Sequence, residues 1–251
     1  MIESPAATAW YVYGVVAAGS AAHDEVRLIG QGGLAAVARE VPLAEFGEDS
    51  LPQRLNDREW LEASVLAHEG VLQAFVETGV VPLRFGAIYR DAREVERMLE
   101  ARSAFFHSAL SRLCGHVEIG VKGWLVAPGP PPRRAEATAA GGRAYLERRR
   151  DELAAARASA DRVVDAVRNV HRQLFAVAVD GVVNRPQPKE LTGRSDEMVM
   201  NAAYLVPVGD RTLVQTVSRV AAESAEAGIE LEVTGPWPPY NFVPDDEEPD
   251  E

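Results

Sequence analysis

Two histidines and the single cysteine are the residues of this chain whose types and spacing come nearest to a metal site. His107 and Cys114 are seven residues apart, which places them on one face of a helix, and His116 follows a helix stop at Gly115. A structural zinc site needs four nitrogen or sulfur ligands, and the sequence offers no fourth candidate nearby. We therefore expect these side chains to serve packing, with no bound metal.

Patterns that would indicate catalysis are missing from the chain. There is no G-x-S-x-G nucleophile elbow and no Walker A loop. The glycines of Gly30-Gln-Gly-Gly33 lack both the spacing and the following helix of a dinucleotide-binding loop, so they predict a tight turn between two strands. The sequence nominates no catalytic residue and no cofactor, and we expect a protein that is not an enzyme.

An arginine interrupts a short apolar stretch formed by Pro82, Leu83, Arg84 and Phe85. Its planar guanidinium needs a carboxylate or carbonyl partner in such surroundings. One interpretation is an ion pair within the domain or a clasp between domains. The other is a contact that docks a partner protein, and on that interpretation Pro82, Leu83 and Phe85 belong to the same partner-binding surface.

A stiff aromatic segment, Thr234-Gly-Pro-Trp-Pro-Pro-Tyr-Asn-Phe-Val243, precedes the acidic end of the chain. Its three prolines fix the backbone and remove three donors, so the segment is extended, polyproline-like or an edge strand. Trp237, Tyr240 and Phe242 project from it, and aromatic side chains held this way provide contact area at little entropic cost. They either fold back onto the core of the protein or form a partner-binding edge.

The elements that position these residues begin with an N-terminal domain, predicted for residues 1–127. Strands are expected at 10–17, 26–29, 34–41, 80–85 and 117–126. We expect the first strand to be buried on both faces, because apolar and polar residues hardly alternate along it. Asn56 or Asp57 can cap a helix that runs to Thr78, and Asp91 can cap a second that runs to Leu113. This order is compatible with one sheet packed against helices.

A Pro/Ala/Arg-rich linker is predicted for residues 128–143, followed by a long helix from about Gly142 to about Val179. Its apolar residues alternate at spacings of three and four, broken only by Arg149. The seam indicates packing against another helix of the same chain, with pairing between molecules as the alternative. The seam consists of Leu146, Leu153, Ala156, Ala160, Val163, Val167, Val170 and Leu174.

The C-terminal domain is predicted for residues 144–244, with a polar loop at 180–196, strands at 198–208 and 229–234, and a helix between them at 211–227. Such an alternation suits a ferredoxin-like half, so the predicted fold class is α+β with two domains. The residues from 245 to 251 contribute six acidic side chains and are expected to form a disordered, solubilising tail, with an interaction role as the alternative.

Five motifs, in this order along the chain, together resemble the gas vesicle protein F/L family. The resemblance spans most of the chain and implies an accessory or minor component of gas vesicles, two α+β domains with a ferredoxin-like second one, and no catalytic residue. It also includes the pair His68-Glu69, for which we favour a fold-stabilising hydrogen bond over a partner-facing role. The motifs are Trp10-Tyr-Val-Tyr-Gly14, Val80-Val-Pro-Leu-Arg-Phe-Gly86, Val121-Lys-Gly-Trp124, Asn201-Ala-Ala-Tyr-Leu-Val206 and the aromatic segment.

Composition limits the classes of partner and the compartment. A formal net charge of −12 argues against nucleic acid or an anionic membrane surface as a partner. One cysteine allows no internal disulfide, which suits the cytoplasm, and the apolar run from Ala9 to Ala18 is too short to span a bilayer.

The sequence thus favours a non-enzymatic accessory protein of gas vesicle formation, in the cytoplasm and at the vesicle. The resemblance implies the hydrophobic major shell protein as its partner, with other gas vesicle accessory proteins as further candidates. A ferredoxin-like small-molecule sensing module is the first alternative, and an enzyme without a recognisable motif is the second.

Overall fold

The computed structural model describes residues 7–22, 26–126 and 142–244 and shows a mixed fold of helices and two antiparallel sheets. Residue contacts divide the chain into two compact units. The first unit comprises Met1–Glu118 together with Pro236–Glu251, and the second comprises Ile119–Gly235.

The sheet of the first unit has the strand order β2-β3-β1-β4, with β5 also paired to β1. Gly32 and Gly33 join β2 to β3, and both have positive φ values, as a two-residue hairpin turn requires. The predicted turn at these glycines is therefore confirmed. The strands are β1 (Thr8–Ala17), β2 (Arg27–Gln31), β3 (Leu34–Pro42), β4 (Val81–Pro82) and β5 (Ile88–Tyr89).

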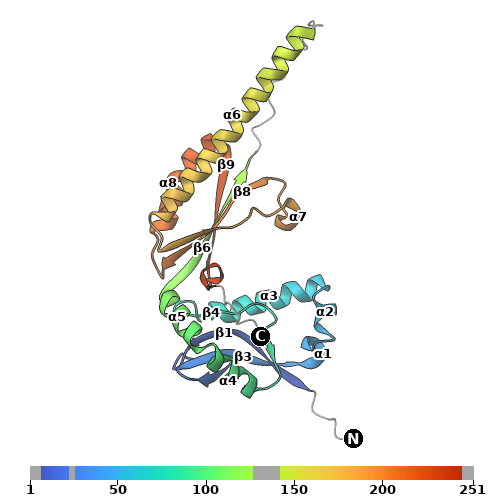
Figure 1. Ribbon diagram of the computed structural model, residues 1–251, viewed down its shortest axis with the longest axis vertical. Helices are drawn as coiled ribbons and strands as arrows, with labels where there is room; N and C mark the ends of the chain where they lie inside the picture. Colours follow the sequence, from blue (N-terminus) through green and yellow to red (C-terminus); the bar gives the residue numbers. More distant parts are fainter. Residues whose placement is uncertain (1–6, 23–25, 127–141, 245–251) are drawn as a thin grey trace. The chain divides into compact units, whose positions relative to one another are not determined.

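Helices lie on both faces of this sheet, with α3 on one face and α4 and α5 on the other (Figure 1). The side chain of Asp57 caps α3 by accepting hydrogen bonds from the backbone of Glu59 and Trp60, and Asp91 caps α4 in the same way. Both caps were predicted. The helices of the unit are α1 (Leu43–Phe46), α2 (Leu51–Arg54), α3 (Arg58–Gln73), α4 (Ala92–Ala101) and α5 (Ser103–Leu113).

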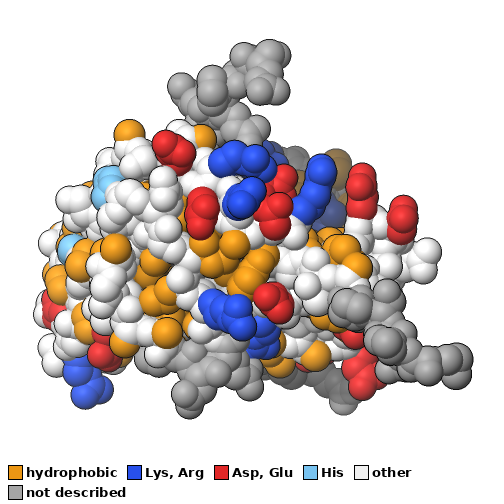
Figure 2. Space-filling model, turned by 90° about the horizontal axis from the view of Figure 1, so that it is seen from below, with side chains coloured by type: hydrophobic (Ala, Val, Ile, Leu, Met, Phe, Trp, Pro, Cys, Tyr) orange, Lys and Arg blue, Asp and Glu red, His pale blue; other side chains and the backbone are white. Residues whose placement is uncertain are grey.

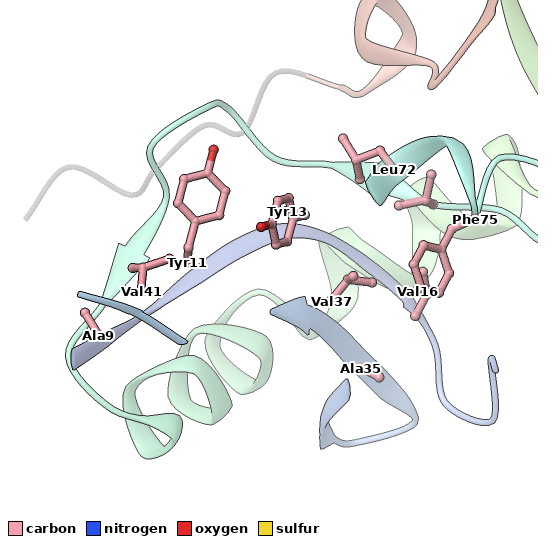
Figure 3. Close-up of a cluster of buried hydrophobic side chains, with 10 residues drawn as sticks. Ala9, Tyr11, Tyr13, Val16, Ala35, Val37, Val41, Leu72 and Phe75 are labelled. Atoms are coloured by element: carbon pink, nitrogen blue, oxygen red, sulfur yellow. The ribbon is translucent and has the colours of Figure 1, made fainter. Parts of the chain in front are cut away.

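Because helices cover both faces of the sheet, both faces of β1 are buried. This explains why apolar and polar residues do not alternate along the strand. On the α3 side, Leu72 and Phe75 meet Tyr11, Tyr13 and Val16 from β1 (Figure 3). This buried aromatic cluster is the part of the core on which the candidate site is built.

The second unit has the strand order β7-β8-β6-β9 and carries α6 and α8 packed against each other. Along the chain its main elements follow as strand, helix, two strands, helix and strand. They are β6 (His116–Leu125), α6 (Gly142–Phe175), β7 (Asp180–Val183), the short α7 (Lys189–Thr192), β8 (Glu197–Pro207), α8 (Thr212–Glu226) and β9 (Ile229–Trp237).

The structure places β6 differently from the sequence prediction. Residues 117–126 were assigned to the sheet of the N-terminal domain, whereas β6 pairs with β8 and β9. The unit boundary therefore lies between Glu118 and Ile119, not near Ala127, and the segment from Pro236 onward belongs to the first unit. Strand pairing is a long-range property that local patterns do not specify. The predicted linker lies outside the described residues up to 141, and the predicted tail lies outside them entirely.

Several predicted elements are shorter or divided. The helix expected from Asp91 to Leu113 is two helices, because Arg102 leaves the helical conformation and its guanidinium lies over the rings of Phe105 and Phe106. The strand expected at 80–85 is reduced to Val81–Pro82, and α3 ends at Gln73. The expected loop at 180–196 contains β7 and α7.

The long helix α6 packs along only part of its length. Val170 and Leu174 are buried, and this end of the helix contacts α8 and β8. By contrast, every residue from 145 to 162 is exposed, including the seam residues Leu146 and Leu153. The expected pairing with another helix of the chain therefore holds only for the C-terminal part of α6.

Candidate docking surfaces

The structure separates the three aromatic residues of the C-terminal segment. Trp237 ends β9 and is 42% exposed, whereas Phe242, in a short 3-10 helix (Tyr240–Phe242), is only 3% exposed. Tyr240 is half-buried and packs against the aromatic cluster of the first unit. Of the three predicted contact residues, Trp237 is the most exposed.

Two carboxylates of the first unit anchor this segment. Glu118 is buried, and its two carboxylate oxygens accept hydrogen bonds from the backbone N–H and the side-chain amide of Asn241, at 2.9 and 2.6 Å. Tyr240 donates a hydrogen bond to Glu69. These contacts fix the backbone immediately after Trp237, so the indole starts from an ordered position.

Burial raises the pKa of both anchoring carboxyls above the ordinary range, and the hydrogen bonds from Asn241 and Tyr240 oppose that shift only in part. A carboxyl with a raised folded-state pKa holds its proton to a higher pH when folded than when unfolded. Its contribution to stability is therefore present at low pH and is lost as the pH rises through the folded-state pKa.

Substituting Glu118→Gln should reduce this loss of stability between mildly acidic and neutral pH. A glutamine retains the shape of the side chain and, after rotation of the Asn241 amide, both hydrogen bonds, but it has no proton to lose. Urea unfolding at a series of pH values measures the effect. Glu118→Ala is the control, since it leaves the Asn241 N–H without an acceptor and should be less stable than the wild type. Equal pH dependence in wild type and Glu118→Gln would contradict the assignment.

A histidine and a tyrosine are joined within the same aromatic cluster. The hydroxyl of Tyr11 lies 2.8 Å from Nδ1 of His68 and accepts a hydrogen bond from the backbone of Gly86 at 3.1 Å. His68 is 3% exposed, and its burial lowers the pKa of the imidazole to about 4. The pair lies across α3 and β1 inside the domain, as expected for a fold-stabilising hydrogen bond.

A crevice of about 240 Å³ opens beside this pair. Five aromatic rings line it, from Tyr11, Tyr13, Phe46, His68 and Phe85, and Tyr11 lies within 6 Å of the other four by centroid distance. Arg39 and Glu40 add one charge of each sign to the lining. Its walls are suited to an apolar group.

The residues from Pro82 to Phe85 also divide between core and surface. Pro82 and Leu83 are buried, because β4 pairs with β1 and Leu83 donates its N–H to the carbonyl of Tyr13. Phe85 is half-buried against the aromatic cluster. Arg84 is exposed and forms no ion pair with another described residue, so the ion pair expected within the domain is absent from the described part of the first unit.

His107, Cys114 and His116 do not form a common site, because each contacts a different backbone carbonyl. The ring of His107 meets the carbonyl of Gly32 at 3.1 Å, Cys114 directs its thiol to the carbonyl of Thr78, and Nδ1 of His116 contacts the carbonyl of Cys114. Within the described residues, no three His, Cys, Asp or Glu side chains are arranged to hold a metal ion.

A groove of about 1220 Å³ in the second unit was not predicted from the sequence. It runs between the middle of α6, the end of α8 and the beginning of β9, and most of its wall is apolar. The apolar lining residues are Leu125, Val126, Ala156, Ala160, Val163, Ala221, Ala225, Ala227, Ile229 and Leu231.

At the edge of this groove, the guanidinium of Arg194 lies 4.5 Å from the centre of the Trp124 ring and pairs with Asp196, Glu230 and Glu232. The indole N–H of Trp124 donates to Glu232 at 2.8 Å. Arg194 thus offsets part of the negative charge of three carboxylates and links the loop before β8 to β9.

Charged side chains of both signs lie on the face of the molecule shown in Figure 2. The face shown in Figure 2 mixes acidic and basic side chains around a central apolar area, in contrast to the continuous basic patch that nucleic-acid binding requires. None of the described helices combines the length and hydropathy needed to cross a bilayer.

Sequence reasoning missed the residues that hold the aromatic segment in place. Glu118 and Asn241 are 123 positions apart and have no shared motif. The one available signal was an acidic residue, Glu118, inside an apolar strand, since a buried carboxylate requires a partner.

The chain matches a protein-family model described as "Gas vesicle synthesis protein GvpL/GvpF" over residues 9–244. It is 38% identical to gas vesicle protein L of Streptomyces sp. (strain CB03234) over 223 residues, covering 86% of this chain and 82% of that one. It is 30% identical to gas vesicle protein F2 of Halobacterium salinarum over 194 residues, covering 74% and 71%.

Two solved structures share the fold. The crystal structure of the gas vesicle protein GvpF from Anabaena sp. PCC7120 has a TM-score of 0.66 at 15% sequence identity, covering 97% of this chain and 99% of that one. The crystal structure of GvpF from Microcystis aeruginosa has a TM-score of 0.63 at 18% identity, covering 94% and 99%. At these identities the likeness concerns the fold alone.

Proposed function

The chain belongs to the GvpL/GvpF family of gas vesicle synthesis proteins, and from that premise we propose that it is a non-enzymatic assembly factor that binds the hydrophobic shell protein during wall formation in the cytoplasm. An unassembled wall protein presents apolar surface and unpaired strand edges, which a binding protein can cover. Other gas vesicle accessory proteins are further proposed partners.

The two-domain description of the chain is part of this proposal. We assign the second unit to the ferredoxin-like class. The support is its order of strand, helix, two strands, helix and strand together with the sheet order β7-β8-β6-β9. Two separately packed units offer two independent surfaces for partners.

The observation that carries the docking proposal is the exposure of Trp237 on an anchored backbone. Its neighbours Pro238 and Pro239 are buried, and Asn241 and Phe242 are held by Glu118 and the core. Trp residues presented in this way are enriched among the side chains that dominate binding energy. Arg84 and Phe85 are the other predicted contact residues that reach the surface, and we include them in the proposed surface.

The groove in the second unit favours a protein partner over the small-molecule alternative. Its wall is mostly apolar, and its volume of about 1220 Å³ is larger than the roughly 300–1,000 Å³ of a usual small-molecule pocket.

Replacing Trp237 by alanine tests the proposal. We expect about 2 kcal/mol loss of affinity for the purified shell protein, roughly thirtyfold, together with a lower yield of vesicles in cells. Because Trp237 is 42% exposed and is not a core residue, its truncation should lower the melting temperature much less than truncation of a buried aromatic side chain.

The matched control is Trp60→Ala, which removes an indole from α3 on the first unit. It should leave shell-protein binding unchanged. Intact binding by a stable Trp237→Ala protein would refute docking through the indole. The charge reversal Arg84→Glu would then test the remaining part of the proposed surface.

A further inference from the structure

A stripe of large apolar side chains runs along the exposed face of α6. Leu146, Leu153, Val164 and Phe175 are 68, 49, 45 and 48% exposed. At 3.6 residues per turn they fall within a sector about 40° wide, and the stripe is about 44 Å long. It is distinct from the face of α6 that buries Val170 and Leu174 against the rest of the unit.

One flank of this stripe is mainly basic, with Asp161 as the one acidic side chain within about 60° of the stripe centre. Arg150, Arg157 and Arg168 lie within about 40° of the centre of the stripe and on the same side of it. All three are exposed, and neither Arg150 nor Arg157 forms an ion pair with another described residue. Arg168 lies 3.8 Å from Asp165, a pair so exposed that it contributes little.

The other flank is formed mainly by small side chains, with Ala156 and Ala160 next to Arg149 and Val167. Small residues beside an apolar stripe allow another helix to approach closely. A narrow stripe is typical of a helix–helix seam, whereas a helix that lies on a membrane has a wide apolar face with basic residues on both sides.

A second copy of the chain would pair poorly with this stripe. In an antiparallel pair the Arg150 and Arg157 rows of the two copies would face each other. In a parallel pair each row would face Ala156, Ala160 and Arg149. The flank supplies one carboxylate, Asp161, for three arginines, so a second copy would leave most of the arginines unpaired, whereas a partner helix with an acidic flank would pair with all of them.

We propose that the α6 stripe docks an amphipathic helix of a partner protein, whose apolar face covers Leu146, Leu153, Val164 and Phe175 and whose acidic side chains pair with Arg150, Arg157 and Arg168. This surface adds a defined class of partner to the assembly role proposed above. It is independent of Trp237, so each surface can fail without the other.

Two synthetic helical peptides probe the surface directly. Both carry leucine at the heptad a and d positions, and they differ only in having glutamate or lysine at the flanking e and g positions. Binding of each to the full chain is followed by fluorescence anisotropy. We expect the glutamate peptide to bind at least tenfold more tightly than the lysine peptide, with a salt-dependent difference.

Three variants of the full chain complete the design. The double variant Leu146→Gln, Leu153→Gln should bind the glutamate peptide at least tenfold more weakly than the wild type. Its melting temperature should not change, because both leucine side chains are exposed. Arg150→Glu with Arg157→Glu should reverse the preference to the lysine peptide. Arg148→Glu with Arg162→Glu makes the same charge change on the far side of the helix and should leave the preference unchanged.

The partner in cells is identified by a photo-crosslinking residue at position 153 in cells that form gas vesicles. The expected product joins this position to an apolar helical segment flanked by Asp or Glu. Equal binding of the two peptides would overturn the proposal. So would dimerisation of the chain that the leucine variant abolishes, or binding to anionic lipid vesicles that this variant abolishes.

Discussion

Replacing Phe242 by alanine is expected to lower the free energy of unfolding by about 3–5 kcal/mol, the usual cost of truncating a buried phenylalanine. The side chain is 3% exposed and lies in the segment that Glu118 holds through Asn241. Removing the ring leaves a cavity, and the short 3-10 helix that carries it has no long-range backbone ladder to keep it in place. Denaturant unfolding of the full chain measures the loss.

Trp237→Ala is the internal control for this result, since it removes a larger aromatic side chain from the same segment. Its 42% exposure predicts a much smaller loss of stability. Should Phe242→Ala unfold at the same denaturant concentration as the wild type, the segment would not be part of the core of the first unit. The two variants together separate loss of binding from loss of folding.

Local patterns in the sequence were sufficient to predict most individual elements. The caps at Asp57 and Asp91, the hairpin turn at Gly32-Gly33 and the strand β1 with both faces buried each depend on neighbours within a few residues. The same is true of β8, where the apolar run from Met198 gives the strand before any partner is known.

The pairing of β6 with β8 and β9 could not be predicted in this way, because contacts between distant segments decide it. For the same reason the sequence suggested a docking role for Tyr240, Phe242, Pro82 and Leu83, all of which the structure buries wholly or in part. An apolar or aromatic residue next to proline is compatible with a core and with an interface. Only the position of its neighbours distinguishes them.

For α6 the sequence pattern predicted more helix packing than the structure shows. Its heptad-like seam is broken only by Arg149 in the sequence, yet only the part near Val170 and Leu174 is buried against other described elements of the chain. A periodic pattern specifies the face that a helix can bury and does not specify how much of that face is covered. The exposed stripe with its arginine row therefore had to be found in the structure.

The second large effect is an acid-induced loss of stability that originates at His68. Its pKa is about 4 in the folded protein, against an ordinary value of about 6.5, because burial disfavours the charged imidazole. Between these two values the unfolded chain binds a proton that the native state does not. Stability should therefore fall as the pH drops from about 6.5 to about 4, by about 3 kcal/mol in total for a shift of this size.

Glu69 and Glu118 contribute in the opposite sense, because burial raises the pKa of each and stability gained from them increases toward acid pH. The pH dependence of the wild-type free energy of unfolding is therefore the sum of opposing contributions. A comparison between variants isolates the imidazole.

His68→Gln provides that comparison, since the amide can still hydrogen-bond to the hydroxyl of Tyr11 but does not titrate. Urea unfolding at pH 7.5, 5.5 and 4.5 should show the wild type losing stability toward acid relative to the variant, whatever the offset between them at pH 7.5. The same substitution at the exposed His107 controls for removal of an imidazole elsewhere in the first unit. Parallel curves for wild type and His68→Gln would show that the imidazole is solvated. The hydrogen bond to Tyr11 would then not be a buried support of the fold.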